Sequence, residues 1–155
     1  MTNELRVPKR RAQVEVIIPG ASPRKVTMFL AEFASGHAGH ERLSDLLNAE
    51  EGEFVPAVDA ESDTMIFLNR ESIAAASISR EWEVDEDLVS AEEHEVEVWL
   101  IDGTSLRGTL HFVLPPDRSR LLDFLNGAQA FLRLWHGDQV TVVNKRHVAR
   151  VAKVK

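Results

Sequence analysis

The chain has 155 residues, a formal net charge of −7 at pH 7 and 44% hydrophobic residues, which is ordinary for a globular protein. It contains no cysteine, and this excludes disulfides, thiolate nucleophiles and cysteine-based zinc sites. No apolar run approaches the roughly 18 residues of a membrane span, and the N-terminus MTNELRVPKRR lacks the apolar core of a signal peptide. We therefore expect a cytoplasmic protein that does not bind membranes.

Part of the sequence occurs twice. RLSDLLN, from Arg42 to Asn48, returns as RLLDFLN from Arg120 to Asn126, with five of seven residues identical at a separation of 120 − 42 = 78. Other matches keep the same order, namely VEV at 14–16 and 96–98, Phe54 and Phe131, and MIFLNRESI at 65–73 with VTVVNKRHV at 140–148. This period exceeds the roughly 20 to 50 residues of a solenoid repeat, and each copy is long enough for a small core. The pattern predicts an internal duplication.

The duplication defines the expected domains. We predict an N-terminal tail over residues 1–13, a first repeat over 14–80, a linker over 81–95 and a second repeat over 96–155. The linker has eight acidic and no basic residues, whereas the second repeat has nine basic and five acidic residues, a difference of +4. A like-charge block is usually solvated and extended. The alternative is an acidic arm that folds over the basic C-terminal residues.

In the first copy, VEV begins a strand that a Pro-Gly turn joins to a second strand over residues 25–30. Leu43, Leu46 and Leu47 then follow the i, i+3, i+4 spacing of one helix face. Strands are expected next at 54–59 and 64–68, and a short closing strand at 73–78. A helix this short needs to dock on the sheet, because fewer than about 12 residues do not hold a helix in isolation.

The second copy predicts the same elements. Residues 96–112 alternate apolar and other residues on either side of Asp102-Gly103, which is typical of a hairpin. Trp99 and Ile101 make the first of these strands apolar on both faces. A helix follows at Leu121, Phe124 and Leu125, with Asp117 and Ser119 as candidate N-caps. Strands over 131–135, 140–143 and 148–154 complete the copy, with a turn at 136–138.

Two sets of polar residues could suggest chemistry, and both have simpler interpretations. Asp45 and Asp123 recur in the two helices, but each follows an arginine by three residues, so we expect a structural ion pair rather than a catalytic carboxylate. His37, His40 and Glu41 are metal-ligand types, yet they lie in a glycine-containing loop and a zinc site needs three or four fixed ligands. We expect no catalytic residue, no metal and no cofactor.

The hairpin of the second copy contains a spaced motif. Residues 98–110 fit V-x-L-x-D-G-x-x-L-x-G-x-L position for position, and by this motif the second copy resembles the Sm-like family of small barrels. That family's second motif contains Arg-Gly, where this chain keeps the spacing but has Asn144-Lys145, and Asn69-Arg70 in the first copy. The segment PPDRSRLLDFLNG also replaces the loop in which Sm-like proteins read a base. The resemblance implies a fold, and we predict a mainly β protein with short helices, as a tandem pair of five-stranded SH3/Sm-like small barrels related by internal duplication.

Two functions are consistent with these features of the sequence. We expect a non-enzymatic binding or scaffolding protein that acts through protein contacts, either with a partner or by self-association, because Sm-like barrels associate through exposed edge strands. The alternative is RNA binding at the basic turn of the second repeat, where the resemblance implies nucleotide contacts. Its candidate ligand-binding residues are Asn144, Lys145, Arg146, His147 and Arg150.

Overall fold

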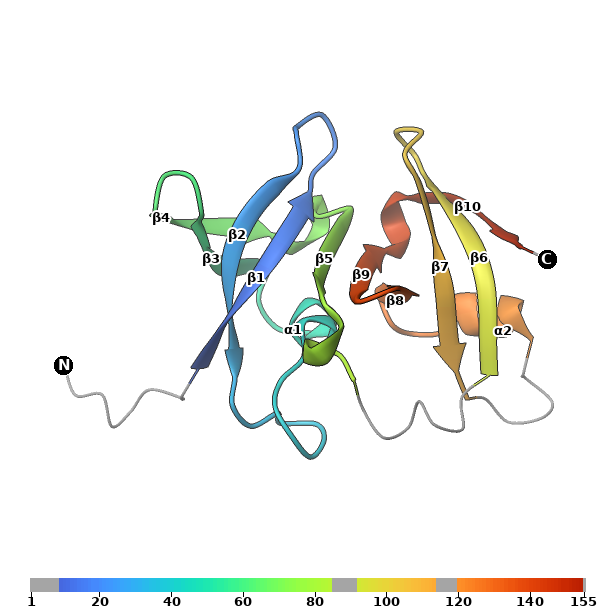
Figure 1. The fold of residues 1–155 in the computed structure, drawn as a ribbon, viewed down its shortest axis with the longest axis horizontal. Helices are drawn as coiled ribbons and strands as arrows, with labels where there is room; N and C mark the ends of the chain where they lie inside the picture. Colours follow the sequence, from blue (N-terminus) through green and yellow to red (C-terminus); the bar gives the residue numbers. More distant parts are fainter. Residues whose placement is uncertain (1–8, 85–91, 114–119, 155) are drawn as a thin grey trace.

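The computed structural model describes residues 9–84, 92–113 and 120–154. The first half contains β1 (Lys9–Ile17), β2 (Arg24–Ala31), α1 (Leu43–Asn48), β3 (Phe54–Asp59), β4 (Thr64–Asn69), η2 (Arg70–Ser72), β5 (Ala75–Ser79) and η3 (Arg80–Trp82). The second half contains β6 (Glu92–Leu100), β7 (Ser105–Phe112), α2 (Leu121–Leu125), β8 (Phe131–His136), β9 (Gln139–Asn144), η6 (Lys145–His147) and β10 (Val148–Lys153). Figure 1 shows the halves side by side.

The strands form one antiparallel sheet in the order β10-β6-β7-β8-β9-β5-β1-β2-β3-β4. The prediction of two five-stranded barrels is therefore wrong, since the described strands belong to a single open ten-stranded sheet. The halves are joined because β5 of the first pairs with β9 of the second, from Ala75 opposite Val143 to Ser79 opposite Gln139. We call the interface between the two halves, which is built around this pairing, the junction. It leaves β4 and β10 as the two edges, at opposite ends of the molecule (Figure 1).

Both halves nevertheless have the same strand order. It reads β5-β1-β2-β3-β4 in the first and β10-β6-β7-β8-β9 in the second, which agrees with an internal duplication. Asn69 and Asn144 occupy equivalent places, because each side chain accepts a hydrogen bond from the backbone N–H two residues later, at 2.9 and 3.0 Å. Each strand of one half therefore has a counterpart in the other, and so do these two asparagines.

The predicted hairpin of the second copy is confirmed. β6 pairs with β7 from Glu92 opposite Phe112 to Trp99 opposite Ser105, and Gly103 in the turn has a φ of 95° that favours glycine. Gly108 has a different role. A Cβ atom there would lie 2.6 Å from the carbonyl oxygen of Trp135, so glycine permits β8 to approach β7 closely.

Both predicted helices form, each preceded by its arginine. In α1 the carboxylate of Asp45 accepts the backbone N–H of Arg42 at 2.9 Å and lies 3.3 Å from its Nε. In α2 the carboxylate of Asp123 lies 3.1 Å from Nε of Arg120, so the ion pair predicted for each of the two aspartates is confirmed. Asp117 and Ser119, the predicted N-caps, lie outside the described residues. None of the helices in the described parts is long and apolar enough to cross a membrane.

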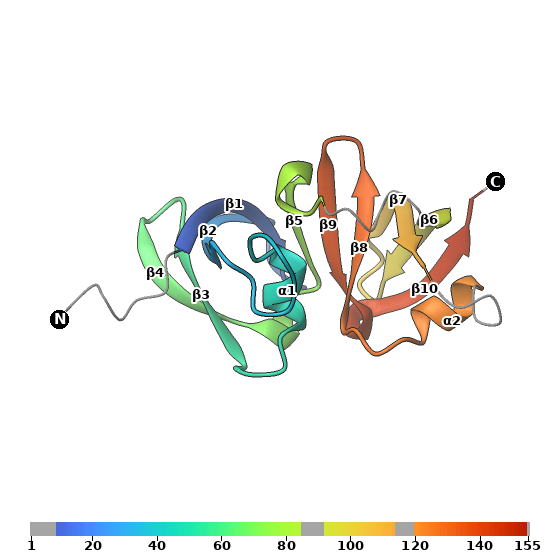
Figure 2. The same cartoon turned by 90° about the horizontal axis from the view of Figure 1, so that it is seen from below.

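The core spans the junction. One buried cluster contains the inner faces of β1 and β2, both buried leucines of α1, and four residues of the second half, namely Phe131, Trp135, Val140 and Val142. A second cluster lies between β6, β7, α2 and the other faces of β8 and β9. Figure 2 shows α1 on the inner side of the first half, facing β8 and β9. Strands β8 and β9 are thus buried on both faces, as their apolar composition requires.

The segment predicted as an acidic linker contributes to both halves. Trp82 packs against the first core and Glu83 is fully buried, whereas Glu92 to Glu95 already belong to β6. Residues 85–91 lie outside the described residues. Apolar and polar groups at the ends of this segment are therefore part of the fold.

Candidate functional site

Four of the residues proposed as an RNA site, from Asn144 to His147, lie at the end of β9 and in η6, whereas Arg150 lies in the edge strand β10. Most of them contact the protein itself. The Asn144 side chain is buried and donates to the carbonyl oxygen of Ile73 at 3.0 Å. The Lys145 ammonium donates to the carbonyl oxygens of Leu125 and Gly127 at 3.0 and 2.7 Å, which satisfies carbonyls at the end of α2. Partial burial lowers the pKa of Lys145.

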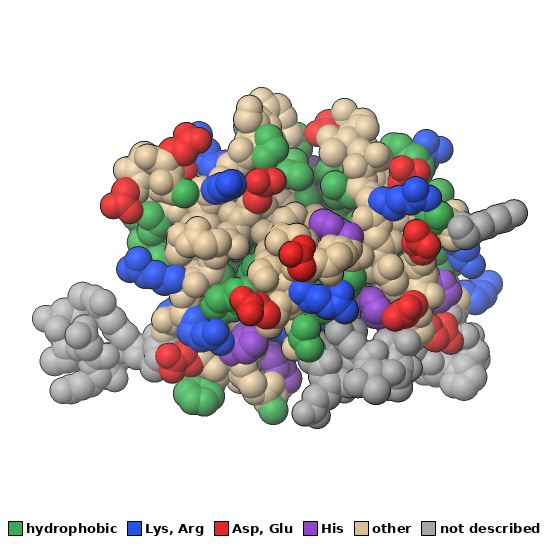
Figure 3. Space-filling model, viewed as in Figure 1, with side chains coloured by type: hydrophobic (Ala, Val, Ile, Leu, Met, Phe, Trp, Pro, Cys, Tyr) green, Lys and Arg blue, Asp and Glu red, His purple; other side chains and the backbone are tan. Residues whose placement is uncertain are grey.

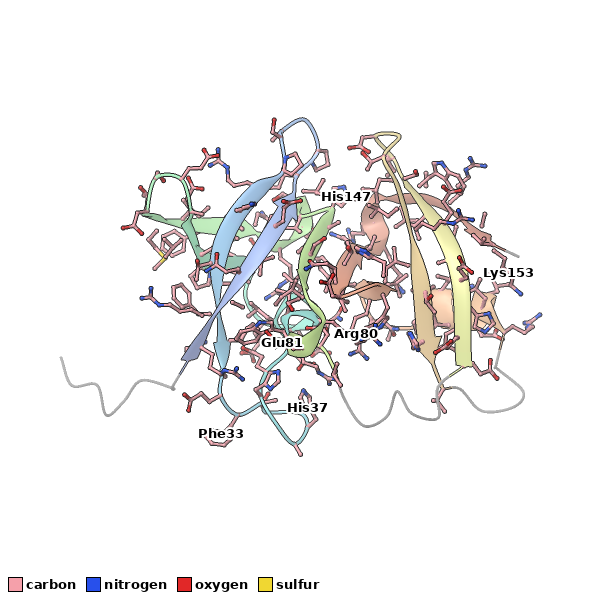
Figure 4. The ribbon with its side chains drawn as sticks, viewed as in Figure 1. Phe33, His37, Arg80, Glu81, His147 and Lys153 are labelled. Atoms are coloured by element: carbon pink, nitrogen blue, oxygen red, sulfur yellow. The ribbon has the colours of Figure 1, made fainter. Side chains whose placement is uncertain are left out.

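The other three candidates are spread along the chain that follows. Nε2 of His147 is 2.7 Å from the carbonyl oxygen of Glu71, and Figure 4 shows this residue between the halves. Arg146 is 77% exposed at its side chain, but the Glu71 carboxylate lies 3.9 Å away. Arg150 lies over the ring of Trp99 at 3.9 Å from its centroid. The candidates therefore do not converge on one phosphate-sized space, and the RNA site stays a prediction that rests on Arg146 and Arg150.

The histidine loop of the first half has two separate contacts. Nε2 of His37 is 2.6 Å from a carboxylate oxygen of Asp45, and this bond raises the pKa of His37. Nε2 of His40 is instead 3.2 Å from the carbonyl oxygen of Trp82. Among the described residues no three histidine or carboxylate groups are placed to hold a metal. The loop links the start of α1 to η3.

A cleft of about 410 Å³ lies beside the junction, lined by residues of α1, β4, β8 and the 3-10 turns η2 and η6. Its arginines have partners close by: Arg70 donates to the carbonyl oxygens of Ala49 and Glu51 at 2.7 and 3.1 Å. Three glutamates, at positions 50, 53 and 71, share the lining with Arg70 and Arg146. The charge balance does not favour a polyanion. Figure 3 likewise shows acidic and basic side chains interspersed over one face of the molecule.

The surface that stands out is the edge formed by β4 and its neighbour β3. Three large apolar side chains are exposed there: Phe67 by 67%, Phe54 by 55% and Met65 by 50%. The register places Phe67 opposite Pro56 and Met65 opposite Val58, so these residues share the outer face of the pair. Sequence reasoning missed this surface, because alternation marks two faces without saying which of them is covered. We call Phe54, Pro56, Met65 and Phe67 the β4 face.

The counterparts of these residues are buried in the second half. Phe54, Met65 and Phe67 correspond to Phe131, Val140 and Val142, of which Phe131 is 3% exposed and both valines are fully buried. They are covered because they face the first half across the junction. The same position in the fold is therefore an interface in one copy and a bare apolar surface in the other.

Polar contacts hold the junction together. The Asn48 side chain of α1 accepts the backbone N–H of Phe131 at 2.8 Å and donates to its carbonyl oxygen at 3.2 Å. Oγ of Ser44 donates to the buried Glu83 carboxylate at 2.6 Å, and the Arg133 guanidinium donates to the Glu83 carbonyl oxygen at 3.0 Å. Burial raises the pKa of Glu83. Helix α1 thus recognises β8 through one amide and one shared acid.

The opposite edge of the sheet has the counterparts of the α1 surface. Asn126 corresponds to Asn48 and is exposed, and Leu122 corresponds to Ser44 and is 57% exposed. Both lie on or just after α2, beside the edge strand β10. We call β10, Leu122 and Asn126 the β10 face.

Comparisons with known proteins provide no identity: no family model matches the chain, and neither the curated proteins nor the solved structures contain a match. The Sm-like resemblance of the second copy accordingly stays a prediction from its first motif.

Proposed function

We propose that this protein is a non-enzymatic binding or scaffolding protein that acts through protein contacts, with the β4 face as its docking surface. One observation supports this most strongly. Phe54, Met65 and Phe67 are exposed on the edge strand β4 and its neighbour β3, whereas their counterparts in the other copy are buried against protein. Exposed edges are templates for strand pairing, and grouped exposed apolar side chains are typical of interaction sites.

The mode of binding follows from the geometry of the edge. A strand from a partner pairs with the backbone of β4 through hydrogen bonds, and exposed side chains such as Phe67 pack against apolar residues of the partner. The chain uses this arrangement once already, at the junction, where β5 adds to β9. Backbone pairing supplies affinity in such contacts, and the apolar face supplies selectivity.

The alternative of RNA binding has less support. Lys145 and His147 already contact backbone carbonyls, and Glu71 lies beside Arg146. Phosphate contacts need cations that are open to the ligand. Fluorescence anisotropy with mixed single-stranded RNA at low salt separates the two functions, because only RNA binding gives a signal that decreases steeply with salt.

The proposed function is tested by affinity capture from the native lysate. Immobilised wild type, Phe67→Asp and Phe33→Asp are compared, followed by mass spectrometry of the retained proteins. Phe33 is a matched control, since it is 77% exposed and lies in a loop away from β4 (Figure 4). We expect partners, the chain's own copies included, to be retained by wild type and Phe33→Asp and lost from Phe67→Asp. Equal retention by all three proteins would exclude the β4 face as the docking surface.

A further inference from the structure

We infer that the β4 face of one molecule binds the β10 face of a second copy, so that the protein associates head to tail. This inference rests on the proposed function and names its partner. The first argument is the strand order. At the junction, the fourth strand of the second half, β9, pairs with the fifth strand of the first half, β5. Among the described strands, the two that have a neighbour on one side only are the remaining fourth strand, β4, and the remaining fifth strand, β10.

The junction also gives the register of this contact. Hydrogen bonds from Asn144 N–H to the Ala74 carbonyl, at 2.9 Å, and from Arg80 N–H to the Asp138 carbonyl, at 2.8 Å, border the β5–β9 ladder. Between them, Ala76 lies opposite Val142 and Ile78 opposite Val140. On the free edges, Val151 and Lys153 take the places of Ala76 and Ile78, and Phe67 and Met65 take the places of Val142 and Val140. The register of the junction therefore places Val151 opposite Phe67 and Lys153 opposite Met65.

Backbone groups at both edges point the right way for this register. In β10, the N–H of Val154 donates to the Glu95 carbonyl of β6 at 2.9 Å. Because successive amides of a strand alternate in direction, those of Val151 and Lys153 are on the free side. In β4, the N–H of Arg70 donates to the Glu53 carbonyl at 2.7 Å, which by the same alternation puts the amides of Met65 and Phe67 on the free side.

The helix contact of the junction has its own counterpart. Asn48 bonds the backbone N–H and carbonyl of Phe131 across the junction. The same amide is present as Asn126, exposed next to β10, and the counterpart of Phe131 is Phe54, exposed on β3. When β10 of one copy adds to β4 of another, Asn126 reaches the backbone of Phe54.

Two positions differ between the copies in a coordinated way. At the junction, Ser44 and Arg133 are polar and share Glu83. Their counterparts on the free faces are Leu122 and Pro56, both apolar and both exposed. In the inferred contact Leu122 packs against Pro56. At the equivalent place in the junction, Ser44 and Arg133 both contact Glu83. The free faces therefore suit each other.

This contact joins two different surfaces, so each molecule keeps one of each kind after binding. A contact of this type produces a closed ring if the rotation between copies closes, and an open chain if it does not. Blocking either face stops growth, and two differently blocked molecules still have one intact pair of faces between them.

The test uses size-exclusion chromatography with light scattering on the full-length chain. Phe67→Asp blocks the β4 face, and Leu122→Asp blocks the β10 face. We expect wild type to increase in mass with concentration and each variant to remain a monomer, with its Kd raised by about tenfold or more. A mixture of equal amounts is expected to form a dimer and nothing larger. Phe33→Asp controls for the introduced charge, and circular dichroism confirms that each variant is folded.

Three outcomes would overturn the inference. Wild type could remain a monomer up to its solubility limit, the mixed variants could fail to dimerise, or Leu122→Asp alone could still dimerise, which indicates a symmetric β4–β4 contact. In each case the capture experiment decides the proposed function separately. If a foreign protein is still retained by wild type and lost from Phe67→Asp, the docking surface is correct and its partner is not a second copy.

Discussion

Replacing Asn48 by alanine tests how the two halves are held together, and Asn126→Ala is its internal control. Asn48 is the only residue of α1 whose side chain is seen to bond the backbone of β8 in the described parts of the chain. The N–H of Lys145 donates to the carbonyl of Ala130 in the strand pair, so the next residue, Phe131, directs its own backbone groups toward α1. Asn48 is thus the partner that these groups have at the junction.

The magnitude follows from the burial of Phe131. Removing the Asn48 amide leaves one backbone N–H and one C=O without their partner, and each buried unsatisfied group costs about 1–3 kcal/mol. The cleft of about 410 Å³ is lined by both Asn48 and Phe131, so water can reach part of the space. We therefore expect a loss near the lower end, about 2–3 kcal/mol in all. Asn126→Ala removes an exposed amide, and we expect a change within about 0.5 kcal/mol.

Guanidinium denaturation followed by tryptophan fluorescence measures both losses. The measurements are made in the Phe67→Asp background, which is expected to keep the chain monomeric. A conserved slope of free energy against denaturant, with a lower midpoint for Asn48→Ala alone, supports the reasoning. Equal losses for the two variants, or a negligible loss for Asn48→Ala, would show that the amide does not hold the junction.

Three further predictions concern the fold. Gly108→Ala places a Cβ atom 2.6 Å from the carbonyl oxygen of Trp135, so we expect a loss of about 1–3 kcal/mol in thermal unfolding; an unchanged Tm would refute the close approach. Burial raises the pKa of Glu83 above 4.5, so the folded state binds more protons and the unfolding free energy decreases as pH rises from about 4.5. Glu83→Gln should remove this slope, and a parallel pH profile for variant and wild type would contradict the assignment. The bond to Asp45 raises the pKa of His37 above 6.5, so its stabilisation is full below that pH and is lost as pH rises through the raised pKa; His37→Gln should therefore destabilise at pH 6 and leave stability at pH 9 unchanged, as urea titrations at both values can check.

The hairpin, the helices and their ion pairs could be predicted from the sequence, because residue patterns within each segment determine them. Alternation on both sides of Asp102-Gly103 predicted the β6–β7 hairpin, and the repeated leucine spacing predicted both helices. The ion pairs of Asp45 and Asp123 were also predictable, since residues three apart on a helix lie close together. These features need no information about distant parts of the chain.

The pairing of β5 with β9, which joins the two halves, could not be predicted from the sequence. Alternation specifies which faces of a strand are apolar, but the backbone groups at its edges are the same in every strand, so it does not specify the neighbour. β9 could pair with β5 of the other half or with a strand of its own half, and both choices bury Val140 and Val142. One indication lay in β8 and β9, which are apolar on both faces and therefore require cover on both sides.

The contacts of the candidate RNA site differed from the prediction for a related reason. Lys145 and His147 have the residue types of a nucleic-acid site, yet their partners are backbone carbonyls of Leu125, Gly127 and Glu71. A backbone carbonyl has no signature in the sequence. Conversely, Phe67 has the residue type of any apolar strand position, and its exposure is explained by the position of β4 at the edge of the sheet that the described strands form.

The chemical difference between the junction and the free faces prevents them from exchanging. If the β10 face of a neighbour replaced β5 on β9, Leu122 would meet Arg133 in place of Ser44. The buried Glu83 carboxylate, 4.0 Å from the guanidinium, would then lose this cation as its partner. Separating a buried charge from its partner costs several kcal/mol, whereas Leu122 against Pro56 removes apolar surface from water on both sides. Asn48 and Asn126 supply the same backbone recognition in both places, so this polar cluster is what distinguishes them. The same pairing geometry can then hold one molecule together and join it to the next without confusing the two contacts.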